Sequence, residues 1–479
     1  MLNNFVQIAK DYNNKNALYC NGIYYTYKEL YGAAFGVKCY LEDNEIRKIG
    51  IFTDNNFHTY AAILGTVLAN KTFVPLNHKF PKDRLLSIKK SVNLKLAFCC
   101  SKSVSKLSEI GLRPVNVEEI EKDKDWVIKK YDSSLEVYVL FTSGSTGEPK
   151  GIPIKYKNLN ALLQNVFTSL PMKGEDKVLQ TFELSFDVSI ALTFMTWFKG
   201  ATLYLAPLDG IIAVNAFKTI LDNKLNWVCM APSAITYLKK LKLLRDYPLP
   251  FVTSTIFTGE ALPVSFAHDW KECAMNSSIF NAYGPTENTV WSFVHEVGDR
   301  TITQNGLVPI GKPISGFDYN INKGLDEIGE LIVTGDQVFG GYVNNESKSK
   351  DVLIKIKNEI YYCTGDSVKE QSNGDIMYLN RLDNQVQING YRVELGEVEY
   401  KINFLLNIQN SVAFVKENNN QLVAVIERKQ ELNREEKREL ITLLPFYMQP
   451  KKFFYLEHFP LNSNSKIDRK AVKAEFDDN

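Results

Sequence analysis

The sequence lacks three features that mark specialised classes of protein: a charge excess, a paired-cysteine motif and a long apolar run. Its 479 residues carry 56 Lys and Arg against 55 Asp and Glu, a formal net charge of +1. This balance argues against nucleic acid as a partner, because binding a polyanion requires a basic surface. The seven cysteines form no CxxC pair. We therefore expect reduced, mostly buried thiols in a cytoplasmic protein.

The sequence also contains no segment with the pattern of a membrane-spanning helix. No apolar run approaches the ~18 residues that cross a bilayer, and no apolar leader opens the chain. We therefore expect no membrane partner. The hydrophobic fraction of 45% and the charged fraction of 23% are typical of a globular protein. The length of the chain suits two or three domains.

Strand and helix patterns alternate through the first part of the chain. Apolar runs at Ile49–Thr53 and Thr72–Leu76 flank Thr59–Asn70, where the apolar residues have helical spacing. This alternation predicts a parallel α/β sheet. Before it, Asn21-Gly22 separates two apolar runs and predicts a β-hairpin.

The most informative stretch is Leu140–Ile154, LFTSGSTGEPKGIPI. A strand-like apolar run leads into small and hydroxyl residues, and Lys150 follows. Small residues let backbone N–H groups approach an anion, hydroxyls add donors, and the lysine adds charge, so the stretch predicts a phosphate-binding loop. No Gly-Lys-Ser/Thr triplet closes it, so it is not a Walker A loop. A flexible Gly/Ser-rich linker is the structural alternative.

Asp187 lies alone in an apolar neighbourhood, LSFDVSI. A buried acid is costly unless it is paired. We weigh two roles for it: a helix N-cap, or a carboxylate that pairs with the ammonium group of a substrate.

Two turns further along the chain carry polar residues at the ends of apolar runs. The sequence NAYGPTE, residues 281–287, places Tyr283, Thr286 and Glu287 at one rim. Ligands of open α/β sheets collect at the carboxyl ends of strands, so this rim is a candidate binding site. Asp366 belongs to a Thr-Gly-Asp turn, which is a weak signal when taken alone.

Taken together, TSGSTGEPKG, NAYGPTE, TGD and the closing NSKIDR resemble the motifs of adenylate-forming enzymes, and they occur in the family's order over nearly the whole chain. This family includes acyl-CoA synthetases, luciferases and the adenylation domains of nonribosomal peptide synthetases. The resemblance implies an α/β fold. It consists of a large multi-subdomain N-terminal region with mixed sheets, residues 1–382, and a small α+β lid domain, residues 383–479. Asp383 is implied as the hinge between them.

The resemblance also implies ATP and Mg²⁺ as cofactors. It makes Lys466, Thr286 and Glu287 the catalytic residues, with Glu287 as the metal ligand; a carboxylate suits a phosphate-bound Mg²⁺. The nucleotide-binding residues that it implies are Thr142, Ser143, Gly144, Ser145, Thr146, Gly147, Lys150, Tyr283, Asp366, Tyr378 and Arg381.

In amino acid adenylation domains, an Asp in this FD-x-S context binds the α-amino group of the substrate, so Asp187 implies an amino acid substrate. The resemblance assigns the substrate pocket to Asp187, Val188, Ala191, Cys229, Ile256, Thr258, Ala282, Val290 and Trp291. The bulk of Trp291 and the lack of a second charge favour a small or medium, mainly apolar side chain.

The expected reaction forms an aminoacyl-adenylate, which then passes to the phosphopantetheine thiol of a separate carrier protein. D-alanine–carrier protein ligases have a similar free-standing architecture. Two alternatives stay open. One is an acyl-CoA synthetase for a non-amino carboxylic acid, and the other is a non-catalytic nucleotide-binding relative.

Overall fold

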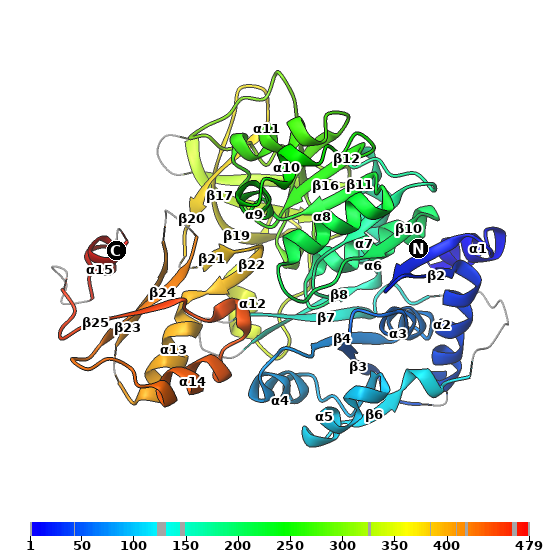
Figure 1. Cartoon of the computed structure of the whole chain (residues 1–479), viewed down its shortest axis with the longest axis horizontal. Helices are drawn as coiled ribbons and strands as arrows, with labels where there is room; N and C mark the ends of the chain where they lie inside the picture. The colour runs from blue at the N-terminus through cyan, green and yellow to red at the C-terminus, as the bar shows by residue number, and fades with distance from the viewer. Residues whose placement is uncertain are drawn as a thin grey trace. The chain divides into compact units, whose positions relative to one another are not determined.

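The computed structural model describes residues 2–42, 44–121, 131–143, 149–323, 327–383, 385–408, 410–416, 420–461 and 467–477. The chain divides into two compact units. Unit 1 comprises Met1–His78, Lys89–Leu140 and Gly151–Leu382. Unit 2 comprises Lys79–Ile88, Phe141–Lys150 and Asp383–Asn479. Figure 1 colours the chain from blue at its N-terminus to red at its C-terminus.

One six-stranded sheet is formed by strands from the first third of the chain, in the spatial order β6-β5-β3-β4-β7-β8. Strand β3 pairs in parallel with β4 and with β5, which confirms the predicted parallel α/β sheet. The strands are β3 Lys48–Thr53, β4 Thr72–Asn77, β5 Leu96–Cys99, β6 Arg113–Asn116, β7 Glu136–Thr142 and β8 Lys150–Lys155.

A nine-stranded sheet has the order β15-β14-β13-β12-β11-β9-β10-β1-β2. The predicted hairpin is its edge, since β1 and β2 pair antiparallel and Asn21 and Gly22 have φ values of 52° and 83°. Its central strands are parallel, and β14 and β15 add an antiparallel edge. The strands are β1 Asn16–Cys20, β2 Ile23–Thr26, β9 Lys177–Gln180, β10 Thr202–Leu205, β11 Trp227–Met230, β12 Ser254–Thr258, β13 Ser278–Tyr283, β14 Phe293–Val297 and β15 Lys312–Pro313.

A five-stranded antiparallel sheet follows in the chain. Its order is β16-β17-β19-β18, and β20 pairs with the other end of β19. Within it, Asp366 of β19 lies directly opposite Arg381 of β20. The strands are β16 Phe317–Lys323, β17 Ile328–Gly335, β18 Leu353–Ile356, β19 Glu359–Glu370 and β20 Ile376–Arg381.

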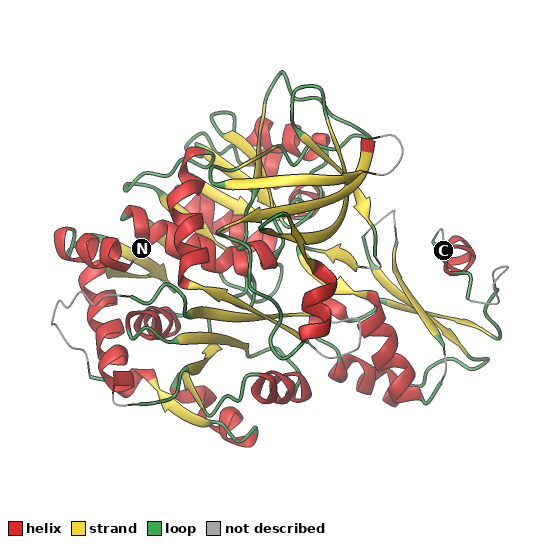
Figure 2. Ribbon diagram, turned by 180° about the vertical axis from the view of Figure 1, so that it is seen from behind, coloured by secondary structure: helices red, strands yellow, loops and turns green. Residues whose placement is uncertain are grey.

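Helices pack against the six- and nine-stranded sheets of unit 1, as Figure 2 shows in red and yellow. Trp197, Trp227, Trp270 and Trp291 are all fully buried between these layers. None of the described helices has the length and apolar character needed to cross a membrane. The helices wholly inside unit 1 are α1 Leu2–Asp11, α2 Tyr27–Glu42, α3 Phe57–Leu68, α5 Val104–Glu109, α6 Tyr156–Asn165, α7 Asp187–Lys199, α8 Ile212–Asn223, α9 Ala234–Lys240, α10 Leu243–Asp246, α11 Val264–Cys273 and α12 Glu346–Val352, the last of which contacts β18 and β19. Most of helix α4, Lys82–Ser91, belongs to unit 2.

Unit 2 has α+β character. It contains a two-stranded sheet, a three-stranded sheet and helices, which Figure 1 draws in orange to red. Helix α14 begins with a capping box between Asn433 and Glu436, which satisfies backbone donors that a helix start leaves unpaired. The elements are β21 Gln385–Ile388, β22 Tyr391–Glu394, α13 Leu395–Leu406, β23 Ser411–Val415, β24 Leu422–Glu427, α14 Arg434–Leu443, β25 Lys452–Leu456 and α15 Arg469–Phe476.

Candidate active site

The predicted pocket residues on strands share one face of the nine-stranded sheet. Cys229 of β11 lies beside Ile256 of β12, and Thr258 lies beside Ala282 of β13. Side chains two residues apart on a strand point to the same side, so these four residues form a single lining. The buried thiol of Cys229 has its pKa raised well above the usual value by desolvation. Cys229 is therefore a neutral wall residue and no thiolate nucleophile.

Helix α7 carries two more of the predicted pocket residues. Val188 and Ala191 are three residues apart on the helix and lie on one face of it. Both belong to the same hydrophobic cluster as Cys229, Ile256 and Ala282. The predicted pocket residues of α7 and of the sheet thus belong to the same apolar core.

Val290 and Trp291, the last two predicted pocket residues, lie in the loop between β13 and β14. Both are buried and belong to the same cluster. The indole Nε1 of Trp291 donates a hydrogen bond of 2.9 Å to Thr258 Oγ1. This bond fixes the orientation of the largest side chain in the pocket, because a buried indole N–H needs an acceptor.

Asp187 is the first residue of α7, and Phe186 is the N-cap. The N-cap alternative for Asp187 is therefore wrong, although Oδ1 of Asp187 accepts a 2.8 Å hydrogen bond from the Val188 amide. The carboxylate is buried, with 9% of the residue exposed. A helix N-terminus stabilises a negative charge, which explains how an acid is tolerated at this apolar site.

The charge of Asp187 also acts on the phenol of Tyr138. Tyr138 on β7 is fully buried, and its pKa is raised well above the usual value by desolvation first and by the charge of Asp187 second. Tyr138 therefore stays neutral beside the carboxylate. Its hydroxyl has no hydrogen-bond partner among the described residues.

Three predicted nucleotide-binding residues form one hydrogen-bonded group. The Tyr283 hydroxyl donates to Oδ2 of Asp366, and Arg381 Nη1 lies 2.9 Å from Oδ1 of the same carboxylate. Arg381 Nη1 also donates to the Thr364 carbonyl at 2.8 Å. Burial and the Asp366 charge raise the Tyr283 pKa well above its usual value, so the phenol is a donor here. Tyr378 lies on β20, the strand that carries Arg381, and is partly buried.

The rim that carries Thr286 and Glu287 is a short 3₁₀ helix, η4 Thr286–Asn288. Glu287 is 1% exposed, and its Oε1 accepts a 2.9 Å hydrogen bond from the hydroxyl of Tyr342. The Phe339 amide donates to the Glu287 carbonyl at 2.8 Å. The sequence analysis missed Tyr342. No local sequence pattern connects Tyr342 to Glu287, which lies 55 residues away.

The donor set suits Mg²⁺ held by phosphate. In the described part of the chain no group of three or more His, Cys, Asp or Glu residues could hold a metal ion. Mg²⁺ is typically bound by one or two carboxylates together with phosphate oxygens and water, and Glu287 fits the carboxylate role.

Inside unit 2, two predicted loop residues bind one acid. Lys150 Nζ lies 2.6 Å from Oε1 of Glu394, and the Ser143 hydroxyl accepts from the Glu394 amide at 3.0 Å. Gln385 also donates to Glu394 Oε1, at 2.6 Å. Sequence reasoning missed Glu394, which lies 244 residues from Lys150. Thr142 ends β7, and Asp383 Oδ1 accepts from the Gln385 amide at 3.1 Å.

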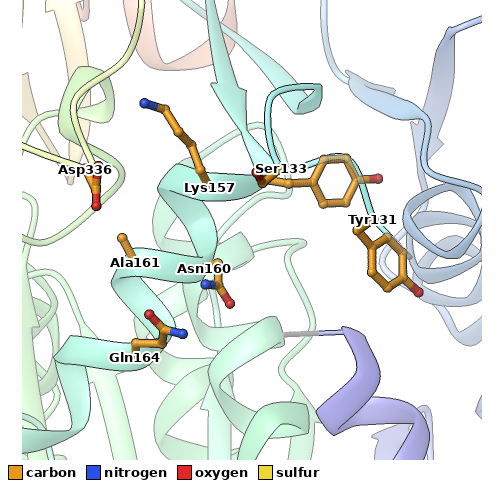
Figure 3. A pocket seen from close by; sticks show the side chains of 8 residues that line it. Tyr131, Ser133, Lys157, Asn160, Ala161, Gln164 and Asp336 are labelled. Atoms are coloured by element: carbon orange, nitrogen blue, oxygen red, sulfur yellow. The ribbon is translucent and has the colours of Figure 1, made fainter. Parts of the chain in front are cut away.

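Five predicted site residues lie outside the described residues: Gly144, Ser145, Thr146, Gly147 and Lys466. A separate cavity of about 370 Å³ in unit 1 contains none of the predicted site residues in its described lining. It lies beside α6, where Lys157, Asn160 and Gln164 line it together with Asp336 (Figure 3).

Comparison with known proteins identifies the family of this chain. Residues 5–343 match the model of the AMP-binding enzyme family. The chain belongs to the AMP-binding enzyme family. It is 30% identical over 475 residues to a D-alanine--D-alanyl carrier protein ligase of Bacillus velezensis, covering 94% of each chain.

One further relative supports this membership, and a solved structure shows the fold. The chain is 30% identical over 479 residues to tyrocidine synthase 3 of Brevibacillus parabrevis, covering 95% of this chain and 7% of that protein. The fold matches the crystal structure of the adenylation domain AlmE of Vibrio cholerae, in complex with glycyl-adenosine-5'-phosphate, with a TM-score of 0.90 at 23% identity. The match covers 100% of this chain and 97% of that chain. The fold is thus the α/β fold of an adenylation domain.

Proposed function

We propose that the protein uses ATP to activate a small α-amino acid and then passes the aminoacyl group to the phosphopantetheine thiol of a separate carrier protein. The observation that carries the proposal is the buried carboxylate of Asp187 at the start of α7, beside the apolar cluster that lines the pocket. An amino acid needs such a pairing for its ammonium group. A fatty acid does not.

In the first half-reaction, an oxygen of the substrate carboxylate attacks the α-phosphorus of ATP. A P–O bond to the β-phosphate breaks, so that the products are the aminoacyl-adenylate and pyrophosphate. The reaction needs no protein nucleophile and depends on positioning and electrostatics. Asp366 and Arg381 are proposed to bind the ribose side of ATP, and Tyr283 the adenine. Mg²⁺, when bound at Glu287, would offset charge on the phosphates.

The remaining proposed roles concern the phosphates of ATP and the transfer of the aminoacyl group. Lys466 and the loop of residues 144–147 are proposed to contact the phosphates. In the second half-reaction a thiolate attacks the acyl carbonyl, a C–S bond forms, and AMP leaves with its oxygen. Residues 383–479 are proposed to act as a lid that turns about Asp383 between the two steps.

The size of the substrate side chain follows from burial. Cys229, Ile256 and Trp291 are each 0% exposed, so none of them borders a space that can hold a water molecule. Asp187 and Val188, at the other end of the pocket, are each 9% exposed. The open part of the pocket thus lies next to the carboxylate. This supports glycine or alanine as the substrate, and the D-alanine ligase relative points the same way.

An adenylate-trapping experiment tests the proposal. The protein is incubated with MgATP and a mixture of glycine, D-alanine, L-alanine, L-leucine and propionate. Hydroxylamine converts any acyl-adenylate to a hydroxamate, which mass spectrometry identifies. We expect hydroxamates of glycine or alanine. A propionyl hydroxamate alone would support the acyl-CoA synthetase alternative, and ATP binding without any hydroxamate would support the non-catalytic one.

A further inference from the structure

The chain makes a strained turn between η4, which carries Thr286 and Glu287, and the proposed pocket residue Trp291. Thr289 and Val290 have positive φ values of 57° and 74°. The Trp291 amide donates to the Thr289 carbonyl at 3.1 Å, which makes Val290 the centre of a γ-turn. A positive φ is rare for a β-branched residue, and a γ-turn of this sign is strained. Such strain persists only where the surroundings enforce it.

The turn folds the chain back on the end of β13. A Cβ atom added to Gly284 would lie 2.2 Å from the Val290 carbonyl oxygen, so only glycine fits there. The Ser292 amide donates to the Tyr283 carbonyl at 2.9 Å. The turn therefore determines where Val290 and Trp291 enter the pocket.

Gln337 forms hydrogen bonds with residues on both sides of this turn. Its Nε2 donates to the Trp291 carbonyl at 3.0 Å and to the Asn288 carbonyl at 3.4 Å. The main-chain carbonyl of Gln337 accepts a 2.6 Å hydrogen bond from Thr289 Oγ1. These bonds reach the residues before and after Val290, and Gln337 is only 1% exposed.

The segment around Gln337 is itself anchored. Asn158 of α6 donates from Nδ2 to the carbonyls of Asp336, at 2.6 Å, and Val338, at 3.1 Å. The Phe339 amide then donates to the carbonyl of Glu287. One anchored segment thus holds both the Glu287 rim and the Val290 turn.

The Gln337 side chain leaves one buried polar atom unpaired. Its Oε1 has no hydrogen-bond partner among the described residues. A buried acceptor without a partner costs stability, so a methionine of similar length would pack there without that cost. Gln337 differs from an apolar residue of similar length in its Nε2 donor, so the function of the side chain depends on that donor.

We propose that Gln337 is a positioning residue, which maintains the Val290 turn and thereby sets the size selection of the substrate pocket. This inference rests on the proposed function. Loss of the Gln337 donor lets the turn relax, and the main chain of Trp291 is then held less firmly at the pocket floor. Binding of the amino acid suffers, while binding of ATP, on the other side of the rim, does not.

The test compares Gln337→Met with a matched control, Thr334→Val. Thr334 lies on β17, is 9% exposed, and donates from Oγ1 to the Ile360 carbonyl at 2.8 Å. Amino acid-dependent ATP–pyrophosphate exchange is measured with D-alanine and with L-leucine. For Q337M we expect the KM for D-alanine to rise about tenfold, and the KM for ATP and kcat to change less than about twofold. The preference for D-alanine over L-leucine should shrink. T334V should change none of these values.

A double substitution separates positioning from a general structural role. Glycine adopts positive φ without strain, so Val290→Gly makes the turn independent of Gln337. On the V290G background, Q337M should therefore change the KM by less than about twofold. An equal rise in KM on both backgrounds, or equal KM values for Q337M and T334V, overturns the inference. If Q337M does not fold, Gln337→Leu removes the same donor and is measured in its place.

Acrylamide quenching of tryptophan fluorescence supplies a readout without substrate. Q337M should increase the quenchable fraction, because Trp291 is released, and T334V should not. Equal quenching of the two variants contradicts the inference. A wild-type protein that shows no exchange with any amino acid refutes the proposed function, and the quenching result then still decides the role of Gln337.

Discussion

Replacing Asp187 with asparagine removes the negative charge from the pocket while the shape of the side chain is kept. The carboxamide oxygen of the D187N variant can still accept the 2.8 Å hydrogen bond that the Val188 amide donates to Asp187. Helix α7 should therefore begin at the same residue. What is lost is the electrostatic partner for a substrate ammonium.

The size of the effect follows from the burial of Asp187, which is 9% exposed. Removing one partner of a buried ion pair costs about 3–5 kcal/mol. At about 1.4 kcal/mol for each factor of ten, kcat/KM for an amino acid should fall about 140- to 3,700-fold. In the folded protein, D187N also weakens the favourable interaction of the charge with the helix N-terminus, which contributes about 0.3–1 kcal/mol.

Pyrophosphate exchange with D-alanine and with propionate provides the assay. The two acids share a carbon skeleton, and propionate lacks the ammonium group. D187N should lose activity with D-alanine and should keep its rate with propionate. Asp176→Asn is the control: Asp176 is buried and accepts bonds from the Lys173 amide and Asn226 Nδ2. Equal losses for both acids, or an unchanged rate with D-alanine, would refute the reasoning.

Three further predictions concern other parts of unit 1. Trp291→Ala should admit L-leucine, because each buried methylene group of the ligand contributes about 0.8 kcal/mol; exchange rates for L-leucine and glycine that keep their wild-type ratio would contradict it. Tyr342→Phe removes the hydrogen bond to Glu287. The Mg²⁺ concentration for half-maximal exchange should rise about tenfold, and an unchanged Mg²⁺ titration would argue against this positioning. Burial lowers the pKa of His295 despite the nearby Asp375. The unfolded state therefore binds a proton more readily as pH falls through about 6.5, and folding stability falls with it. His295→Gln should reduce the loss of Tm between about pH 7.5 and pH 5.5, and an unaltered pH dependence would contradict the assignment.

Some of this structure could be predicted from the sequence because local chemistry determines it. Asn21-Gly22 supplies the two positive φ values that a tight hairpin needs, and the hairpin is present. The alternation of strands and helices predicted the parallel sheet. The family resemblance named Ile256 and Thr258, and the structure places both on one face of β12 because they lie two residues apart.

Other features depend on contacts that no local pattern encodes. Glu394 pairs with Lys150 across 244 residues of sequence, and Tyr342 meets Glu287 across 55. The Val290 turn runs against local preference, since a β-branched residue is the least expected one at positive φ. Tertiary contacts, among them the bonds from Gln337, hold this turn, so sequence reasoning could not have found it.

The most direct test of the central claim is the ratio of wild-type exchange rates for D-alanine and propionate at equal concentrations. If the buried acid of α7 selects an α-ammonium group, the ratio should exceed about one hundred, in line with the loss of a buried ion pair. Equal rates for the two acids, or a faster rate with propionate, would contradict the account.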